Sequence, residues 1–203
     1  MKIKIRLAKP EEITTILELQ SQALTFLSAI DYTATEIEAM IQTQGKARTD
    51  CQEIVFVAEE QETSPIDISR THNIPQKKII GFSCLSSHSA DINGIYIHPD
   101  RIRQNIGTQL LQAIEAVAIE KRYRRLWVSS ALNAIKFYQA NGYQKKSYQR
   151  LQLNNIHISV AIMSKQLIPL TESEKAIRKI GVLAIAIFTI FAIILIVFAL
   201  GNF

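Results

Sequence analysis

Cysteine is scarce in this chain, which contains only Cys51 and Cys84 among its 203 residues. Two cysteines cannot form a framework of disulfides, and they are too few for a cysteine-rich zinc site. Cys84 lies within an apolar run, so we expect it to be a small buried hydrophobic side chain. This cysteine usage fits a reducing compartment.

A large excess of one charge is also missing, because the formal net charge is +5 at pH 7. The basic residues are dispersed along the chain, which argues against nucleic acid as a partner. A modest positive charge instead suits an anionic cofactor or an anionic membrane surface. Internal repeats and low-complexity tracts are absent as well, and the length predicts one domain with an appendage.

Charged residues are absent from the segment 180–200, in which Thr189 carries the only hydroxyl. As a helix, this segment would be roughly 30 Å long, the thickness of the hydrocarbon core of a bilayer. A buried helix of that length normally shows a polar stripe, and this segment has none. We therefore predict a transmembrane helix over 180–200; the alternative is a hydrophobic helix that docks on a partner.

Three basic residues, Lys175, Arg178 and Lys179, precede this segment. Lysine and arginine are retained on the cytoplasmic side of membrane spans. We therefore expect a tail-anchored, single-pass membrane protein whose N-terminal domain faces the cytoplasm. The expected organisation is a globular domain over 1–168, a linker over 169–179 and the span over 180–200.

The pattern of apolar residues predicts seven strands, near 2–7, 53–59, 78–86, 91–98, 125–130, 144–152 and 156–165. Helices are predicted from 10 to about 26, over 32–41, over 106–118 and after 132. Thr33 and Glu36 fit a capping box, and Asn154-Asn155 fits a hairpin turn. The polar segment 60–76 is predicted to be an exposed loop. This order indicates an α+β fold, with a mixed, mostly antiparallel sheet and helices on both faces.

The segment between the strand 91–98 and the helix that begins at Ile106 has the character of a phosphate site. The first N–H groups of a helix are unpaired, and they lie at the positive end of its dipole. Arg101 and Arg103 flank this turn and can pair with phosphate oxygens. Gly107 allows a ligand to approach the backbone closely. The alternative is a turn that serves only to pack the helix on the sheet.

Two segments together resemble the GCN5-related N-acetyltransferase (GNAT) superfamily. Positions 102–107, Ile-Arg-Gln-Asn-Ile-Gly, are similar to its turn Gln/Arg-x-x-Gly-x-Gly/Ala, and positions 133–143 match its pattern Asn-Ala-x-x-Phe-Tyr-x-x-x-Gly-Phe/Tyr. Asn105 replaces the first glycine of the turn, but asparagine tolerates left-handed backbone angles better than most residues. Ile102 replaces the opening Gln/Arg, and Arg103 follows one place later. The resemblance covers residues 1–168.

The resemblance implies acetyl-CoA as co-substrate, bound in a cleft where the strands 91–98 and 125–130 splay apart. No metal is needed. A backbone N–H of the strand 91–98 would hold the acetyl carbonyl and stabilise negative charge on its oxygen during attack. The pyrophosphate would rest on the turn, and the pantetheine arm would lie on the edge of the strand 91–98. The implied binding residues are Ile95, Ile97, Arg103, Gln104, Asn105, Ile106, Gly107, Thr108 and Asn133. For Asn133 the alternative is a cap on the helix that follows Leu132.

The same resemblance implies that Tyr138 is the general acid that protonates the departing thiolate. A phenol with a pKa of about 10 keeps its proton at neutral pH. The alternative is a core tyrosine. An amine acceptor must lose a proton before attack, and Asp91 could remove it through a water chain, unless Asp91 is simply a solvated turn residue. His88 and His98 have a suitable pKa for the same role.

The predicted function is therefore an N-acetyltransferase, which transfers acetyl from acetyl-CoA by direct attack of an amine. The acceptor would be an amine-bearing small molecule or a protein. The changed positions Ile102 and Asn105 motivate two alternatives, a catalytically inactive membrane-tethered acyl-CoA-binding module and a scaffold that uses only the fold. The sequence leaves open the acceptor, the membrane and the oligomeric state.

Overall fold

A computed structural model describes residues 2–50, 52–61 and 78–169. The chain divides into two compact units, Met1–Leu167 and Ile168–Phe203. The predicted transmembrane helix over 180–200 lies outside the described residues, as do nearly all of the predicted linker and loop. Within the described ranges, no helix is long and apolar enough to cross a bilayer.

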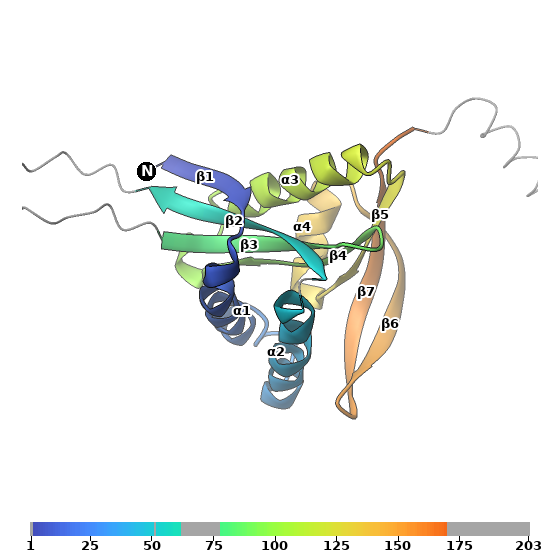
Figure 1. The fold of residues 1–203 in the computed structure, drawn as a ribbon. Coiled ribbons are helices and arrows are strands. Elements are labelled where there is room, and N and C mark those ends of the chain that lie inside the picture. The colour runs from blue at the N-terminus through green and yellow to red at the C-terminus, as the bar shows by residue number, and fades with distance from the viewer. Residues whose placement is uncertain (1, 51, 62–77, 170–203) are drawn as a thin grey trace, which may run out of the picture. The chain divides into compact units, whose positions relative to one another are not determined.

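The first unit is built on a seven-stranded sheet in the order β1-β2-β3-β4-β5-β7-β6 (Figure 1). Its strands are β1 (Lys2–Leu7), β2 (Glu53–Gln61), β3 (Lys78–Ser86), β4 (Asp91–Ile97), β5 (Arg125–Ser130), β6 (Gln144–Leu153) and β7 (Ile156–Gln166). The helices are α1 (Ile13–Leu27), α2 (Ala34–Thr49), α3 (Ile106–Glu120) and α4 (Ile135–Ala140), with short 3-10 helices η1 (Pro10–Glu12), η2 (Pro99–Arg101) and η3 (Leu132–Ala134). The predicted order of elements and the α+β class are confirmed.

The helices cover both faces of the sheet, with α1 and α2 on one side and α3 and α4 on the other (Figure 1). Successive side chains of a strand point to opposite faces. In β4, Ile95 and Tyr96 therefore lie on opposite faces: Ile95 packs against the cluster that contains Leu111 of α3, and Tyr96 packs against the cluster that contains Leu24 of α1. Each face thus has its own apolar core, and β4 contributes to both.

The pairing of β4 changes along its length. Its parallel contact with β5 covers only Asp91 with Trp127 and Ile92 with Val128. Its antiparallel contact with β3 contains a bulge at Asn93, because Cys84 pairs with Gly94 and Leu85 pairs with Ile92. Beyond Ile92, β4 consequently has β3 on one side and a gap in the sheet on the other.

Two local predictions are confirmed in detail. The Thr33 N–H donates to Glu36 Oε2 at 2.8 Å, and the Glu36 N–H donates to Thr33 Oγ1 at 3.3 Å, which is the capping box at the start of α2. Asn154 and Asn155 have φ of 47° and 67°, as a tight hairpin turn requires. The helix α2 is longer than predicted, because residues 42–49 are mostly polar and continue it without the apolar periodicity that the prediction used.

Candidate active site

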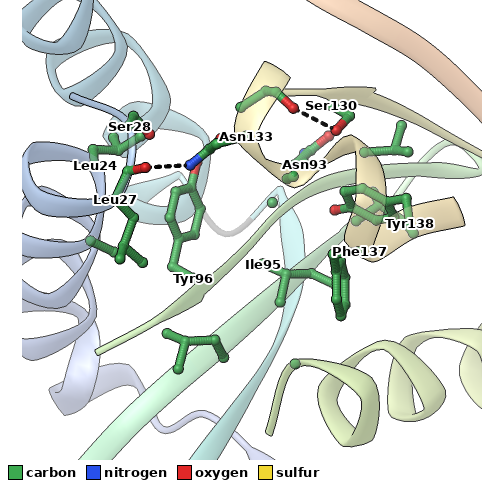
Figure 2. Close-up of a pocket in the computed structure, with 18 of the residues that line it drawn as sticks. Leu24, Leu27, Ser28, Asn93, Ile95, Tyr96, Ser130, Asn133, Phe137 and Tyr138 are labelled. Carbon is green, nitrogen blue, oxygen red and sulfur yellow. Dashed lines mark hydrogen bonds between the residues drawn. The ribbon is translucent and has the colours of Figure 1, made fainter. Parts of the chain in front are cut away.

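A cavity of about 1020 Å³ occupies the gap between β4 and β5. It is lined by residues from both faces of the sheet, including Phe137 and Tyr138 of α4 and Leu24 and Leu27 of α1 (Figure 2). The cavity therefore passes through the sheet at the point where the two central strands separate.

The turn before α3 forms one wall of this cavity. Arg103 and Asn105 both have left-handed backbone angles, with φ of 59° and 61°. Asparagine adopts this region more readily than most residues, so Asn105 can take the place of the family's first glycine with little backbone strain. The cavity wall includes five of the predicted turn residues, Arg103, Asn105, Ile106, Gly107 and Thr108; Gln104 is the one predicted binding residue that lies outside it.

The first residues of α3 present backbone donors at this wall. The first N–H groups of an α-helix have no partner within the helix, and they lie at its positive end. Gly107 also has a packing role, because a Cβ built on it would lie 3.1 Å from Phe137 Cε2. The glycine thus brings the start of α3 against α4 and joins the two segments on which the family resemblance rests.

The two arginines of the turn differ in their surroundings. Arg101 forms an ion pair with Glu60, with Nη2 at 3.1 Å and Nε at 3.4 Å from Oε2. Arg101, which was expected to be able to pair with a phosphate, is therefore already engaged by a carboxylate of β2. Arg103 is exposed at the cavity wall, and it is the cation that a phosphate would meet.

Tyr138 is both a core residue and a cavity residue, so its burial in the core leaves the predicted role as general acid open. Only 4% of the residue is exposed, and its ring makes edge contacts with Phe137 and Tyr143 at centroid distances of 5.1 and 5.4 Å. Its hydroxyl is directed into the cavity (Figure 2). Burial raises the pKa of Tyr138 well above that of a free tyrosine, and nearby Tyr96 and Cys84 raise it further. The phenol therefore stays protonated over the whole neutral range.

Asn133 lines the cavity but does not cap the following helix. Its Nδ2 donates to the Leu27 carbonyl oxygen at 2.7 Å (Figure 2). The caps of η3 and α4 are Ala131 and Ala134, and neither has a side-chain capping bond. The capping alternative is thus wrong. Instead, Asn133 satisfies a carbonyl at the C-terminal end of α1, which has no partner within its own helix.

Polar side chains gather where β4 begins. Asp91 is exposed and lines the cavity beside the last paired positions of β4 and β5. The Asn93 Nδ2 donates to Glu53 Oε1 at 2.7 Å, and both residues also line the cavity. Glu53 was not among the residues predicted from the sequence. Its alternation with Val55 and Val57 gives the face of the sheet on which Glu53 lies, but its contact with Asn93 of β4 is set by the tertiary structure.

The histidines lie apart from this group. His98 Nδ1 accepts a hydrogen bond from the Asp100 N–H at 3.3 Å, so His98 caps η2. His88 is exposed and is not among the residues that line the cavity. The remaining predicted residues, Ile95 and Ile97, line the cavity from β4. Among the described strands, none pairs with β4 on that side at these two residues, so their backbone groups face the gap.

Comparison with known proteins agrees with this geometry. Residues 51–145 match the family described as Acetyltransferase (GNAT) domain. No curated protein shows significant similarity to the sequence. Among solved structures, a GCN5-related N-acetyltransferase from Rhodopseudomonas palustris has a TM-score of 0.67 and 22% identity, over 82% of this chain and 96% of that one.

Two further similar structures were solved with a ligand bound. The PaiA N-acetyltransferase from Thermoplasma acidophilum, in complex with coenzyme A, has a TM-score of 0.59 and 19% identity, over 82% of this chain and 99% of that one. A phosphinothricin acetyltransferase of the GNAT superfamily from Sinorhizobium meliloti, in complex with acetyl-CoA, has a TM-score of 0.54 and 15% identity, over 85% and 95% of the two chains. The first unit therefore has a GNAT-type fold, and residues 51–145 within it match the model of the GNAT acetyltransferase domain.

Proposed function

We propose that this protein is an N-acetyltransferase that uses acetyl-CoA as its co-substrate. The observation that carries the proposal is the shared cavity, which places the donor-rich start of α3 and the buried phenol of Tyr138 on the walls of one gap. The complexes of the two similar structures with coenzyme A and acetyl-CoA support this choice of co-substrate.

The residues at the turn fit a pyrophosphate. The N–H groups of Ile106, Gly107 and Thr108 are the first of α3, and Arg103 supplies a positive charge beside them. The unpaired edge of β4 at Ile95 and Ile97 would hold the amide groups of the pantetheine arm. Asn133, whose Nδ2 is engaged by Leu27, would offer only its remaining amide groups.

In the proposed reaction, the nitrogen lone pair of the amine attacks the thioester carbonyl carbon. A C–N bond forms, and the carbonyl oxygen takes up negative charge. The bulge at Asn93 leaves a backbone group of β4 without a ladder partner, and an N–H there would stabilise that charge. The C–S bond then breaks, and the electron pair leaves on sulfur.

Tyr138 would stabilise the departing thiolate. A thiol has a pKa of about 8.5 and a phenol about 10, so complete transfer of the proton in water would be uphill. Burial in the cavity disfavours the thiolate as well as the phenolate, because both are anions. The phenol therefore donates a hydrogen bond as the charge develops and passes its proton as the C–S bond breaks. Asp91 is our candidate for removing the proton of the attacking amine, through water.

The membrane anchor is a separate proposal. Residues 180–200 lack charge, and three basic residues precede them, which supports a single span with the catalytic domain in the cytoplasm. With such a tether, we expect the acceptor to be at the membrane, either an amine of a protein or a small molecule derived from the membrane.

The first test is calorimetric titration of acetyl-CoA and CoA into the full-length protein in detergent solution. We expect micromolar binding that falls at least tenfold in Arg103→Glu. The matched control is Arg150→Glu, because Arg150 is exposed on β6 and is not among the residues that line the cavity. No binding by the folded wild-type protein would exclude both the enzyme and the binding module, and would leave the scaffold.

A screen of amines for release of free CoA thiol then separates the enzyme from a binding module. Turnover that Tyr138→Phe reduces supports the enzyme. Tight binding of acetyl-CoA without turnover of any amine would support the inactive module, for which the buried phenol in the cavity has no evident use.

A further inference from the structure

The half of the cavity on the α1/α2 face has a different chemical character from the half at the turn. Its walls come from α1, α2, β6 and β7, and among the described side chains of these four elements none that lines the cavity is charged. Most of its wall is apolar and is formed by Leu24, Leu27, Met40, Leu151, Leu153 and Ile158. This half is an apolar chamber.

The chamber is held in place by hydrogen bonds between distant parts of the chain. The Tyr32 hydroxyl donates to the Ser159 carbonyl oxygen at 2.7 Å and accepts from the Leu132 N–H at 3.0 Å. It thereby ties the connection between α1 and α2 to β7 and η3. The bond from Asn133 to Leu27 fixes the end of α1 in the same way. The apolar walls are therefore built into the fold.

Two carboxylates lie at the edge of this chamber. Glu53 and Asp91 are the only acidic residues that line the cavity within the described part of the chain. Glu53 shares a strand face with Val57, which packs with Ile16 of α1. Asp91 precedes Ile92, which packs on the α3 face, so Asp91 belongs to the α1/α2 face. Both carboxylates thus point to the side on which the chamber lies.

The positive charges lie elsewhere. The described basic residues that line the cavity, Arg101 and Arg103, both belong to the turn before α3, and Arg101 is held by Glu60. An acceptor with a negative charge would therefore meet apolar side chains and two carboxylates in the chamber. An ammonium group would meet complementary charge at Glu53 and Asp91, and an apolar body behind it would be buried favourably.

On the basis of the proposed function, we propose that the acceptor is a primary monoamine on an apolar body, such as an alkylamine. Its amine lies beside Glu53 and Asp91, and its body fills the chamber formed by α1, α2, β6 and β7.

The test compares amines of matched length on the full-length protein in detergent solution, with CoA release as the readout. Hexylamine is compared with 6-aminohexanoate, which adds a negative charge at the far end, and with 1,6-diaminohexane, which adds a positive one. We expect kcat/KM for hexylamine to exceed both by at least tenfold. From butylamine to octylamine, kcat/KM should rise roughly threefold per methylene group.

Two variants probe the two parts of the chamber. Leu153→Lys places a cation on the apolar wall, so the ratio of kcat/KM for 6-aminohexanoate to that for hexylamine should rise at least tenfold. Leu7→Lys changes an exposed residue of β1 and should leave this ratio unchanged. Glu53→Gln should raise KM for hexylamine about tenfold and leave the Kd of acetyl-CoA unchanged. A general loss of structure would instead weaken the binding of acetyl-CoA as well.

Calorimetry with acetyl-CoA on the same samples separates the two levels of the proposal. Absence of acetyl-CoA binding would overturn the proposed function, and this inference with it. Binding of acetyl-CoA together with equal or better use of the two charged amines, or with use of no amine in the series, would overturn the inference alone and leave the cofactor site standing.

Discussion

Gly107 at the start of α3 lies against the ring of Phe137 in α4, so closely that a Cβ on Gly107 would be 3.1 Å from Phe137 Cε2. Phe137 in turn makes an edge contact with Tyr138, at a centroid distance of 5.1 Å. The proposed phosphate turn and the proposed acid are therefore coupled through a single aromatic ring. A change in the position of this ring would affect both.

Gly107→Ala is expected to weaken acetyl-CoA binding about tenfold with little effect on folding. Alanine favours a helix over glycine by about 1 kcal/mol, which offsets the displacement of the ring. The Phe137→Leu variant gives the added methyl group room, so the double variant should regain part of the affinity. Calorimetry measures the acetyl-CoA affinity of the single and the double variant, and Gln112→Ala on the exposed face of α3 is the control. Unchanged affinity in Gly107→Ala would show that the contact has no bearing on the ligand.

Tyr138→Phe is expected to reduce kcat about a hundredfold, as loss of a general acid typically does, while the Kd of acetyl-CoA changes less than twofold. Burial raises the pKa of Tyr138, so the wild-type kcat should show no decline from phenol ionisation up to about pH 10. Steady-state kinetics across this pH range measures both effects. Tyr143→Phe is the control, because Tyr143 is buried beside Tyr138 and is not among the cavity-lining residues. Equal losses in the two variants would contradict the assignment.

Stability at alkaline pH should depend on Tyr143. Burial, together with the negative charge of Glu115, raises the pKa of Tyr143 above the value of about 10 in the unfolded chain. The folded protein therefore holds a proton that the unfolded chain releases, and the resulting stability is complete below pH 10 and is lost as the pH rises further. We expect the free energy of unfolding above pH 10 to fall less steeply in Tyr143→Phe, by about 1.4 kcal/mol per pH unit.

Urea denaturation between pH 8 and pH 11 measures this difference in slope. The exposed Tyr148 provides the matched control, since Tyr148→Phe removes a hydroxyl from the surface. Parallel curves for the wild-type protein and Tyr143→Phe would rule out the linkage.

Tyr32→Phe is expected to lower the free energy of unfolding by about 1–3 kcal/mol. The ring keeps its packing, but the Leu132 N–H loses its acceptor and the Ser159 carbonyl loses its donor. Urea denaturation at neutral pH measures the cost. The exposed hydroxyl of Tyr148 again serves for comparison, and its removal should cost less than about 0.5 kcal/mol. If the two substitutions cost the same, Tyr32 does not tie the chamber together.

Membrane attachment is predicted to depend on the uncharged segment 180–200. Ile190→Lys places a charge at the middle of the proposed span, where lysine costs about 3 kcal/mol. In cell fractions washed at alkaline pH, we expect the wild-type protein to remain with the membranes and this variant to be partly released. Asn202→Lys, which lies beyond the segment, should behave as the wild type. Release of the wild-type protein would exclude the span.

The local features of this fold were predictable because they depend on neighbours in sequence. The capping box of Thr33 and Glu36 and the turn at Asn154-Asn155 are set by residues at most three positions apart. The two family-like segments similarly pointed to the turn and to Tyr138, which line one cavity. Helix α2 extended past its prediction, since the prediction relied on an apolar stripe that residues 42–49 lack.

The sequence by itself determined the order of strands and helices, the chemistry of the turns and the uncharged segment 180–200, because all three follow from short-range patterns of side chains. The tertiary structure alone decided that Arg101 pairs with Glu60 and that Asn133 bonds to Leu27, contacts that span 41 and 106 positions of the chain. It also placed Glu53 at the cavity. Such pairings depend on which elements the fold brings together, and the pattern around any one of these residues carries no record of its distant partner.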